Sequence, residues 1–143
     1  MKKLLNTSFI YAISAIICGV FYREFTKFMN FNGRTTLAFT HLHLFVLGTG
    51  VFLILALFSL QTNLLEQKKF RLFYTTYNIG LPLMILMFFV RGIVQVLETP
   101  LSKGMNAAIS GMAGVTHIIM TISMILLFLC MKNLSPKQMR EEK

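Results

Sequence analysis

Four long apolar runs, separated by short polar segments, make up most of the chain. The runs cover residues 4–22, 37–60, 73–97 and 105–131. Each is close to or above the roughly 20 apolar residues that a helix needs to cross a bilayer. Because backbone polar groups in lipid must be satisfied within the segment, we expect these runs to be α-helices. The pattern predicts one all-α domain over residues 1–143, a polytopic four-helix transmembrane bundle with a charged tail over residues 132–143.

The composition agrees with a membrane protein. Hydrophobic residues make up 55% of the chain and charged residues 13%, whereas a soluble domain has about 25% charged residues. The net charge of +9 is compatible with a nucleic-acid partner, but in so apolar a chain we assign it to loops that fix the topology. No small-x-small cleavage motif follows the first run, so we expect it to remain as a helix.

Lysine and arginine are divided unevenly between the two ends of this predicted bundle. With four helices, both termini and the loop between the second and third runs share one side. Nine basic residues belong to that side: Lys2, Lys3, Lys68, Lys69, Arg71, Lys132, Lys137, Arg140 and Lys143. Four belong to the other side: Arg23, Lys27, Arg34 and Lys103. Because basic loops stay in the cytoplasm, we expect both termini there, in the cytoplasmic (inner) membrane of a bacterial-type cell.

Three histidines fall inside the apolar runs, where ionisable residues are rare and usually mark a site. His41 and His43 belong to the second run, near its outer end. Helical residues turn by about 100° each and rise by about 1.5 Å, so these two side chains point about 200° apart at nearly the same depth. A helix that carries two such imidazoles can serve two different neighbours.

His117 lies in the fourth run, after many small residues. It shares a helical face with Ala107, Ser110, Gly114 and Thr121. A face of small residues allows another helix to approach closely. A small face that ends in an imidazole also suits a flat macrocycle with one axial ligand, and the sequence leaves both interpretations open.

Haem is the first candidate for what these histidines bind, because neutral imidazole is a standard axial ligand of haem iron. The axial ligands would be His41, His43 and His117. Copper or zinc is the second candidate, although zinc takes four ligands, or three and a water, and two of the imidazoles point apart. A proton relay is the third, with Glu98 as the one accompanying carboxylate. The fourth is a structural or accessory membrane protein without cofactor, whose imidazoles bond neighbouring helices.

Polar residues near the outer end of the third run share one face, because Arg91, Gln95 and Glu98 are spaced i, i+4, i+7. One interpretation pairs Arg91 with Glu98 at the headgroups. The other aims Arg91 at an acidic ligand such as a haem propionate. With haem b as cofactor, we expect six residues at the propionates or in the pocket: Arg91, Arg34, Gln95, Phe45, Gly111 and Gly114.

The stretch THLHLFVLGTGVFLILALF, which begins at Thr40, is similar to the helix of haem–copper oxidase subunit I that carries a His-x-His motif followed by a glycine. The resemblance covers this run alone. It implies that His41 ligates a high-spin haem and that His43 is one of two axial ligands of a low-spin haem. The chain as a whole resembles a family of small, uncharacterised four-helix bacterial membrane proteins.

The resemblance to the oxidases also implies an assembly. Their subunit I has twelve helices in three arcs of four, and this chain supplies one such arc without the copper-binding histidines. We therefore expect a homo-oligomer, a trimer before a dimer, with haem at the subunit boundaries. His43 is nine residues from Arg34 and His117 fourteen from Lys103, which gives depths of about 13 and 21 Å. This difference favours pairing His43 of one copy with His41 of the next.

Together these observations predict an integral membrane haem b-binding protein for electron transfer, haem handling or haem sensing. The alternatives are a structural or accessory membrane protein without cofactor and a copper or zinc carrier. No Ser/His/Asp set, paired carboxylates or phosphate loop is evident, so no enzymatic activity is assigned. Besides the lipid bilayer, a quinol or another redox partner is compatible with the chain.

Overall fold

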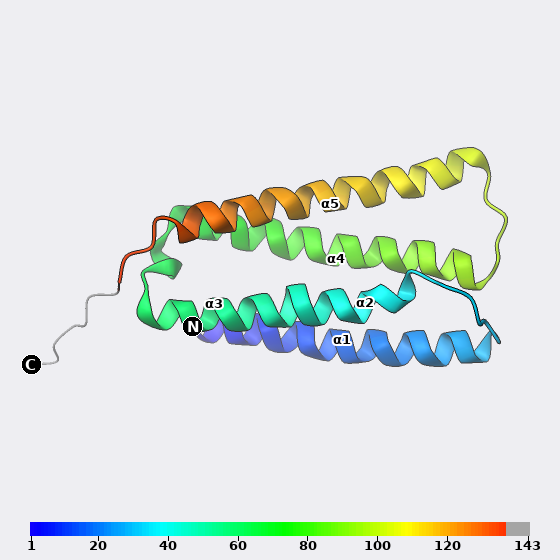
Figure 1. Cartoon of the computed structure of the whole chain (residues 1–143), viewed down its shortest axis with the longest axis horizontal. Coiled ribbons are helices and arrows are strands. Elements are labelled where there is room, and N and C mark those ends of the chain that lie inside the picture. The colour runs from blue at the N-terminus through cyan, green and yellow to red at the C-terminus, as the bar shows by residue number, and fades with distance from the viewer. Residues whose placement is uncertain (137–143) are drawn as a thin grey trace, which may run out of the picture.

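The protein is built from four nearly parallel rods, as a computed structural model of the chain shows (Figure 1). The structure describes residues 1–136, and these contain helices and no strand. The elements in chain order are α1 (Lys2–Phe28), α2 (Leu37–His43), the π-helix η1 (Leu44–Gly50), α3 (Val51–Gln61), the short η2 (Leu64–Glu66), α4 (Lys68–Val96) and α5 (Lys103–Met131). The second rod consists of α2, η1 and α3 in continuous succession. Each rod is long and apolar enough to cross a membrane, which confirms the predicted all-α, four-helix fold.

The rods are longer than the apolar runs that predicted them. The first run, residues 4–22, lies within α1, and the third, residues 73–97, begins one turn after the start of α4. Charged residues such as Arg23 and Lys69 continue these helices, because lysine and arginine favour helix nearly as well as leucine does. The predicted tail begins at residue 132, directly after α5, and its residues 137–143 lie outside the described part of the chain.

Residue 1 and residue 136 lie at the same end of the bundle, next to the connection between α3 and α4 (Figure 1). We call this the terminal end, and the end with the α1–α2 and α4–α5 connections the loop end. The second rod packs against α1 along its whole length, and α5 packs along α4. The first three rods also contact one another, since Thr7 and Tyr11 of α1 bond to Tyr74 and Asn78 of α4. Helix α5 lies against α4, and one of its sides has no neighbour within residues 1–136.

Aromatic rings fill the core at the terminal half of the bundle. Phe52, Phe73 and Tyr77 are completely buried, and the ring of Phe52 lies within 6.4 Å of the other two, centroid to centroid. Tyr11 of α1 stacks on Phe52 at 5.8 Å. Aromatic pairs at such distances contribute beyond their buried area, so this cluster joins α1, α3 and α4.

The start of α2 is held against α4 by three hydrogen bonds. Thr35 Oγ1 donates to the carbonyl of Gly92 at 3.0 Å, and Thr36 Oγ1 donates to the carbonyl of Phe88 at 2.9 Å. The backbone N–H of Thr36 donates to Gln95 Oε1 at 2.8 Å. As a result, α2 begins well inside the loop end of α4, rather than level with it.

This docking depends on Gly92. A Cβ atom at this position would lie 2.5 Å from Leu37 Cγ and 2.7 Å from the backbone nitrogen of Leu37. Neither atom can retreat easily, because Leu37 is completely buried and starts the helix. Only glycine allows the two backbones to approach this closely.

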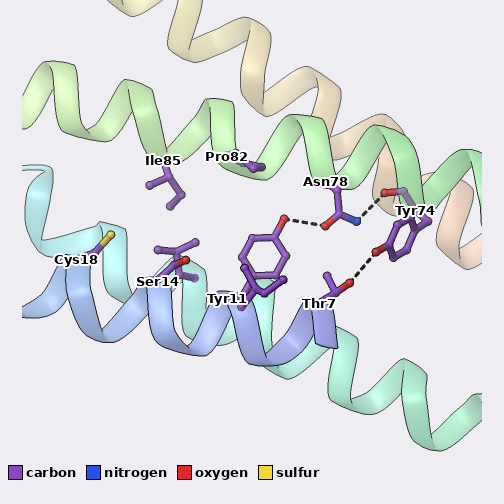
Figure 2. A pocket seen from close by; sticks show the side chains of 10 residues that line it. Thr7, Tyr11, Ser14, Cys18, Tyr74, Asn78, Pro82 and Ile85 are labelled. Atoms are coloured by element: carbon purple, nitrogen blue, oxygen red, sulfur yellow. Dashed lines mark hydrogen bonds between the residues drawn. The ribbon is translucent and has the colours of Figure 1, made fainter. Parts of the chain in front are cut away.

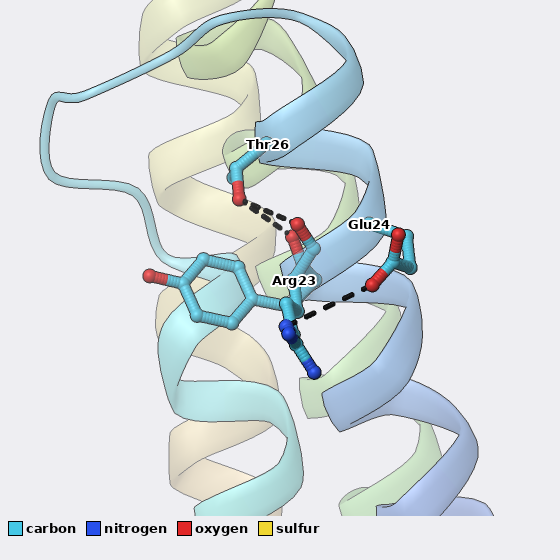
Figure 3. A network of polar contacts seen from close by, with 4 residues as sticks. Arg23, Glu24 and Thr26 are labelled. Carbon is cyan, nitrogen blue, oxygen red and sulfur yellow. Dashed lines mark hydrogen bonds and ion pairs between the residues drawn. The ribbon is translucent and has the colours of Figure 1, made fainter.

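Left-handed residues end two helices at the loop end. Asn30 follows α1 with φ 50° and Glu98 follows α4 with φ 49°. In each case the next N–H bonds to a carbonyl in the last turn, Phe31 to Thr26 and Thr99 to Val94, both in the Schellman pattern. Figure 3 shows the exposed surface of α1 beside the first cap, where Arg23 Nε lies 3.8 Å from the Glu24 carboxylate. An ion pair that is so exposed contributes little to stability. The turns of the chain at this end are determined by the two helix caps.

Replacement of Gly92 by alanine is expected to weaken the bundle. The added Cβ must push Leu37 and the start of α2 away from α4, and overpacking of this kind costs roughly 1–3 kcal/mol of unfolding free energy. Denaturation of the purified protein in micelles, followed by circular dichroism, measures the loss.

Gly111→Ala is the matched control, because no heavy atom lies within 4 Å of a Cβ added at that position. Alanine there improves helix propensity by roughly 1 kcal/mol, so this variant should be as stable as the parent or more so. Similar losses from both substitutions would contradict the close approach at Gly92.

Candidate functional site

His43 is the last residue of α2 and faces α4. Its Nδ1 lies 2.8 Å from the carbonyl oxygen of Phe39, one turn earlier in the same helix. A carbonyl can only accept, so Nδ1 carries the proton, and in the neutral ring Nε2 has the free lone pair. The ring lies 4.8 Å from that of Phe88, centroid to centroid, in an edge-on arrangement.

His117 of α5 is arranged in the same way. Its Nδ1 lies 2.8 Å from the carbonyl oxygen of Ala113, so the neutral ring again has its lone pair on Nε2. Its ring lies 6.1 Å from that of Phe88, and the residue is exposed. Both imidazoles therefore lie beside the Phe88 ring. The distance between them cannot exceed the sum of the distances from that ring to His43 and to His117.

The predicted difference in depth between His43 and His117 rested on an assumption that the structure does not meet. It assumed that both helices begin at the same level, near Arg34 and Lys103. The second rod instead begins inside the bundle, where Thr35 and Thr36 bond to α4. This offset brings His43 level with Phe88, and thus beside His117.

Arg91 lies on α4 near this pair of histidines, but it does not pair with Glu98. Its guanidinium donates to Ser110 Oγ at 2.6 Å and to the side-chain oxygen of Asn106, both on α5. Helix α4 ends at Val96, and Glu98 already belongs to the turn. Of the two interpretations of the spacing, the headgroup ion pair is not formed, and Arg91 instead makes hydrogen bonds between α4 and α5.

The side of α5 that carries His117 is open. The five residues predicted to share its face are all exposed: Ala107, Ser110, Gly114, His117 and Thr121. A Cβ added at Gly114 would meet no heavy atom within 4 Å. We call the surface formed by His43, Phe88, His117, Arg91 and Ser110 the histidine face.

His41 looks the other way, toward α1, as the turn of about 200° predicts. Its ring stacks on Tyr22 at 6.4 Å and lies against Gly19, where an added Cβ would come 3.6 Å from the His41 side chain. Its Nδ1 is buried and has no hydrogen-bond partner among the described residues. A buried polar atom without a partner costs roughly 1–3 kcal/mol, and among the three histidines His41 is the one whose Nδ1 has no partner within the described residues.

Three of the other predicted pocket residues lie away from the histidine face. Arg34 and Gln95 line a cavity of about 310 Å³ at the loop end, together with Tyr22 and Phe39. The side-chain oxygen of Gln95 is already bonded to Thr36. Gly111 is exposed on α5 and borders an apolar cavity of about 370 Å³ between α4 and α5.

Phe45, predicted as part of a haem wall, is 41% exposed and lies within η1. No arrangement of three or more His, Cys, Asp or Glu side chains able to hold a metal ion occurs within residues 1–136. A bare zinc ion needs three or four such ligands. Haem iron already has four ring nitrogens and needs one or two imidazoles, so the donor set fits haem better than a bare ion.

Sequence reasoning missed the π-helix that follows His43 directly. In η1, hydroxyl groups from two other helices bond to the widened backbone: Tyr77 donates to the carbonyl of Leu47 and Ser8 to that of Thr49, each at 2.9 Å. Gly48 allows Tyr11 to pack here, since an added Cβ would lie 2.5 Å from Tyr11 Cγ. Such π-turns often occur at functional sites. The one signal in the sequence is the Gly48-Thr49-Gly50 triplet within an otherwise apolar run.

Comparison with known proteins gives a family without an assigned activity. No curated protein matches the chain, and no solved structure does. One family model, described as "Protein of unknown function (DUF2871)", matches residues 1–134. The chain therefore belongs to the DUF2871 family.

Proposed function

We propose that this protein binds haem b at the histidine face, with imidazoles of His43 and His117 as axial ligands of the iron. The main support for this proposal is that the two imidazoles have the same tautomer, with the proton on Nδ1. Each donates its Nδ1 proton to a carbonyl of its own helix, which fixes the ring and leaves Nε2 free to ligate. Metal-bound histidines usually have their second nitrogen bonded in this way.

The surroundings of the two imidazoles support a flat, apolar ligand. Phe88 and Phe39 offer aromatic walls, since both rings lie within 6.5 Å of the His43 ring. On α5, Gly114 allows close approach of a ring. The guanidinium of Arg91 stands at the polar edge, where it would exchange its hydrogen bonds to Asn106 and Ser110 for bonds to a propionate carboxylate.

The second axial ligand is assigned to a neighbouring copy. Within one chain Phe88 lies beside both imidazoles, so a haem between them would have to displace this ring. The open side of α5 provides a surface for another copy. A closed ring of three chains, each supplying four helices as one arc of haem–copper oxidase subunit I does, would place a haem at every boundary.

A haem with two imidazole ligands supplies one-electron chemistry and has no open coordination position, which suits electron transfer. His43 and His117 would hold the iron, and Arg91 would orient the propionates. The excess of basic residues at the terminal end would keep that end in the cytoplasm of a bacterium. His41 as the ligand of a further haem stays a prediction.

The absorption spectrum of the purified full-length protein, expressed with haem supply, tests the cofactor. We expect a Soret band and split low-spin bands in the reduced protein. His43→Ala and His117→Ala should each abolish the low-spin bands, because each removes one axial ligand.

His41→Leu is the matched control, since it removes an imidazole on the opposite side of the same helix and should keep the bands. A colourless protein would overturn the proposal in favour of a structural role. Copper or zinc found by elemental analysis, without a Soret band, would indicate a metal carrier.

Co-expression of the His43→Ala and His117→Ala chains tests whether two copies share the haem. No chain in the mixture has both ligands, but a boundary between unlike chains can. With random assembly, we expect about one quarter of the parental haem per chain. Complete absence of the low-spin bands in mixed oligomers, confirmed by a different tag on each chain, would place both ligands in one chain.

A further inference from the structure

A second site candidate lies between α1 and α4 and shares no residue with the histidine face. It is a cavity of about 460 Å³, within the size range of small-molecule sites. Figure 2 shows its lining, with Tyr11 and Ser14 on α1 and Asn78 and Tyr74 on α4. Apolar side chains, among them Leu44 and Ile85, form the rest of the wall. A polar patch in an apolar cavity at membrane depth needs a partner for each polar group.

The protons of both tyrosines in this cavity are already engaged. Thr7 Oγ1 donates its one proton to the carbonyl of Lys3 at 3.0 Å. The contact of 2.6 Å between Thr7 Oγ1 and the Tyr74 hydroxyl therefore has Tyr74 as donor. Tyr11 donates to Asn78 Oδ1 at 2.9 Å. Both phenolic oxygens thus have lone pairs left to accept, and no proton left to give.

Ser14 and Asn78 provide further hydrogen-bonding groups in the cavity. The Ser14 hydroxyl forms no hydrogen bond with any residue of the described chain, and the residue is half-buried. Asn78 donates one N–H to the carbonyl of Tyr74 at 2.7 Å and has a second to offer. The cavity therefore presents two phenolic acceptors, one hydroxyl that can both donate and accept, and one amide N–H that can donate.

We propose that this cavity binds a lipid-soluble hydroquinone by its ring. The ring hydroxyls would donate to the oxygens of Tyr11 and Tyr74 and accept from Ser14, while the apolar substituents contact Leu44 and Ile85. The oxidised quinone has carbonyl groups in place of hydroxyls and cannot donate to the two phenols. The cavity thus discriminates in favour of the reduced form.

The cavity lies close in the chain to two residues of the histidine face, His43 and Phe88. Leu44 follows His43 directly in the chain, and Ile85 lies one helical turn before Phe88. A ring bound there would lie beside the histidine face. Binding itself rests on the cavity alone and does not require that haem is present.

Carbon-13 NMR of the full-length protein in micelles, labelled at tyrosine Cε, tests the site directly. The chain has four tyrosines, and Tyr→Phe variants assign their signals. Titration with a short-chain p-benzoquinol should shift the signals of Tyr11 and Tyr74. Tyr22, at the loop end, should not respond. The corresponding quinone should bind about tenfold more weakly, as expected when a buried hydrogen bond is lost.

Ser14→Ala should weaken the quinol about tenfold without moving the Tyr22 signal, since the hydroxyl has no structural partner to lose. Ser135→Ala, which changes an exposed serine after the end of α5 that belongs to neither proposed site, is the control and should leave quinol affinity unchanged. No shift of Tyr11 and Tyr74 at the solubility limit of the quinol would overturn the proposal. Equal binding of the quinol and its dimethyl ether would also overturn it, and would indicate a groove for lipid chains. Because no haem signal is used, failure here is distinct from failure of haem binding.

Discussion

The contact between Leu37 and Gly92 determines where the candidate ligands lie. Because of this contact, the second rod begins beside the last turns of α4. There Thr35 and Thr36 bond to the carbonyls of Gly92 and Phe88. His43 follows six residues after Leu37 and is thereby brought level with Phe88. A helix that began level with the loop end of α4 would leave His43 short of Phe88, and the histidine face would not form.

Hydrogen bonding in lipid explains which polar side chains are available to a ligand. An unpaired polar group costs several kcal/mol there, so most hydroxyls of the bundle bond to backbone carbonyls, as Tyr77 and Ser8 do in η1. The groups left over are few: Nε2 of His43 and of His117, the Ser14 hydroxyl, and Nδ1 of His41, which is buried without a partner. Apart from Nδ1 of His41, which faces α1, these groups belong to the two sites we propose.

The sequence predicted the fold well because four apolar runs of spanning length leave little choice in lipid. It placed helix ends less well, since α1 and α4 continue through charged residues such as Lys27 and Lys69. The opposite directions of His41 and His43 followed from the helical turn alone. The proximity of His43 to His117 did not, because it depends on the Gly92 contact between residues far apart in the chain. The π-helix could not be predicted from the sequence either, because its backbone carbonyls bond to Tyr77 and Ser8 of other helices.

Electron paramagnetic resonance of the oxidised, purified full-length protein tests the central claim most directly. This method reports the spin state of the iron and the nature of its axial ligands. We expect a low-spin ferric signal characteristic of two imidazole ligands. A purely high-spin signal, or a protein without iron, would contradict it.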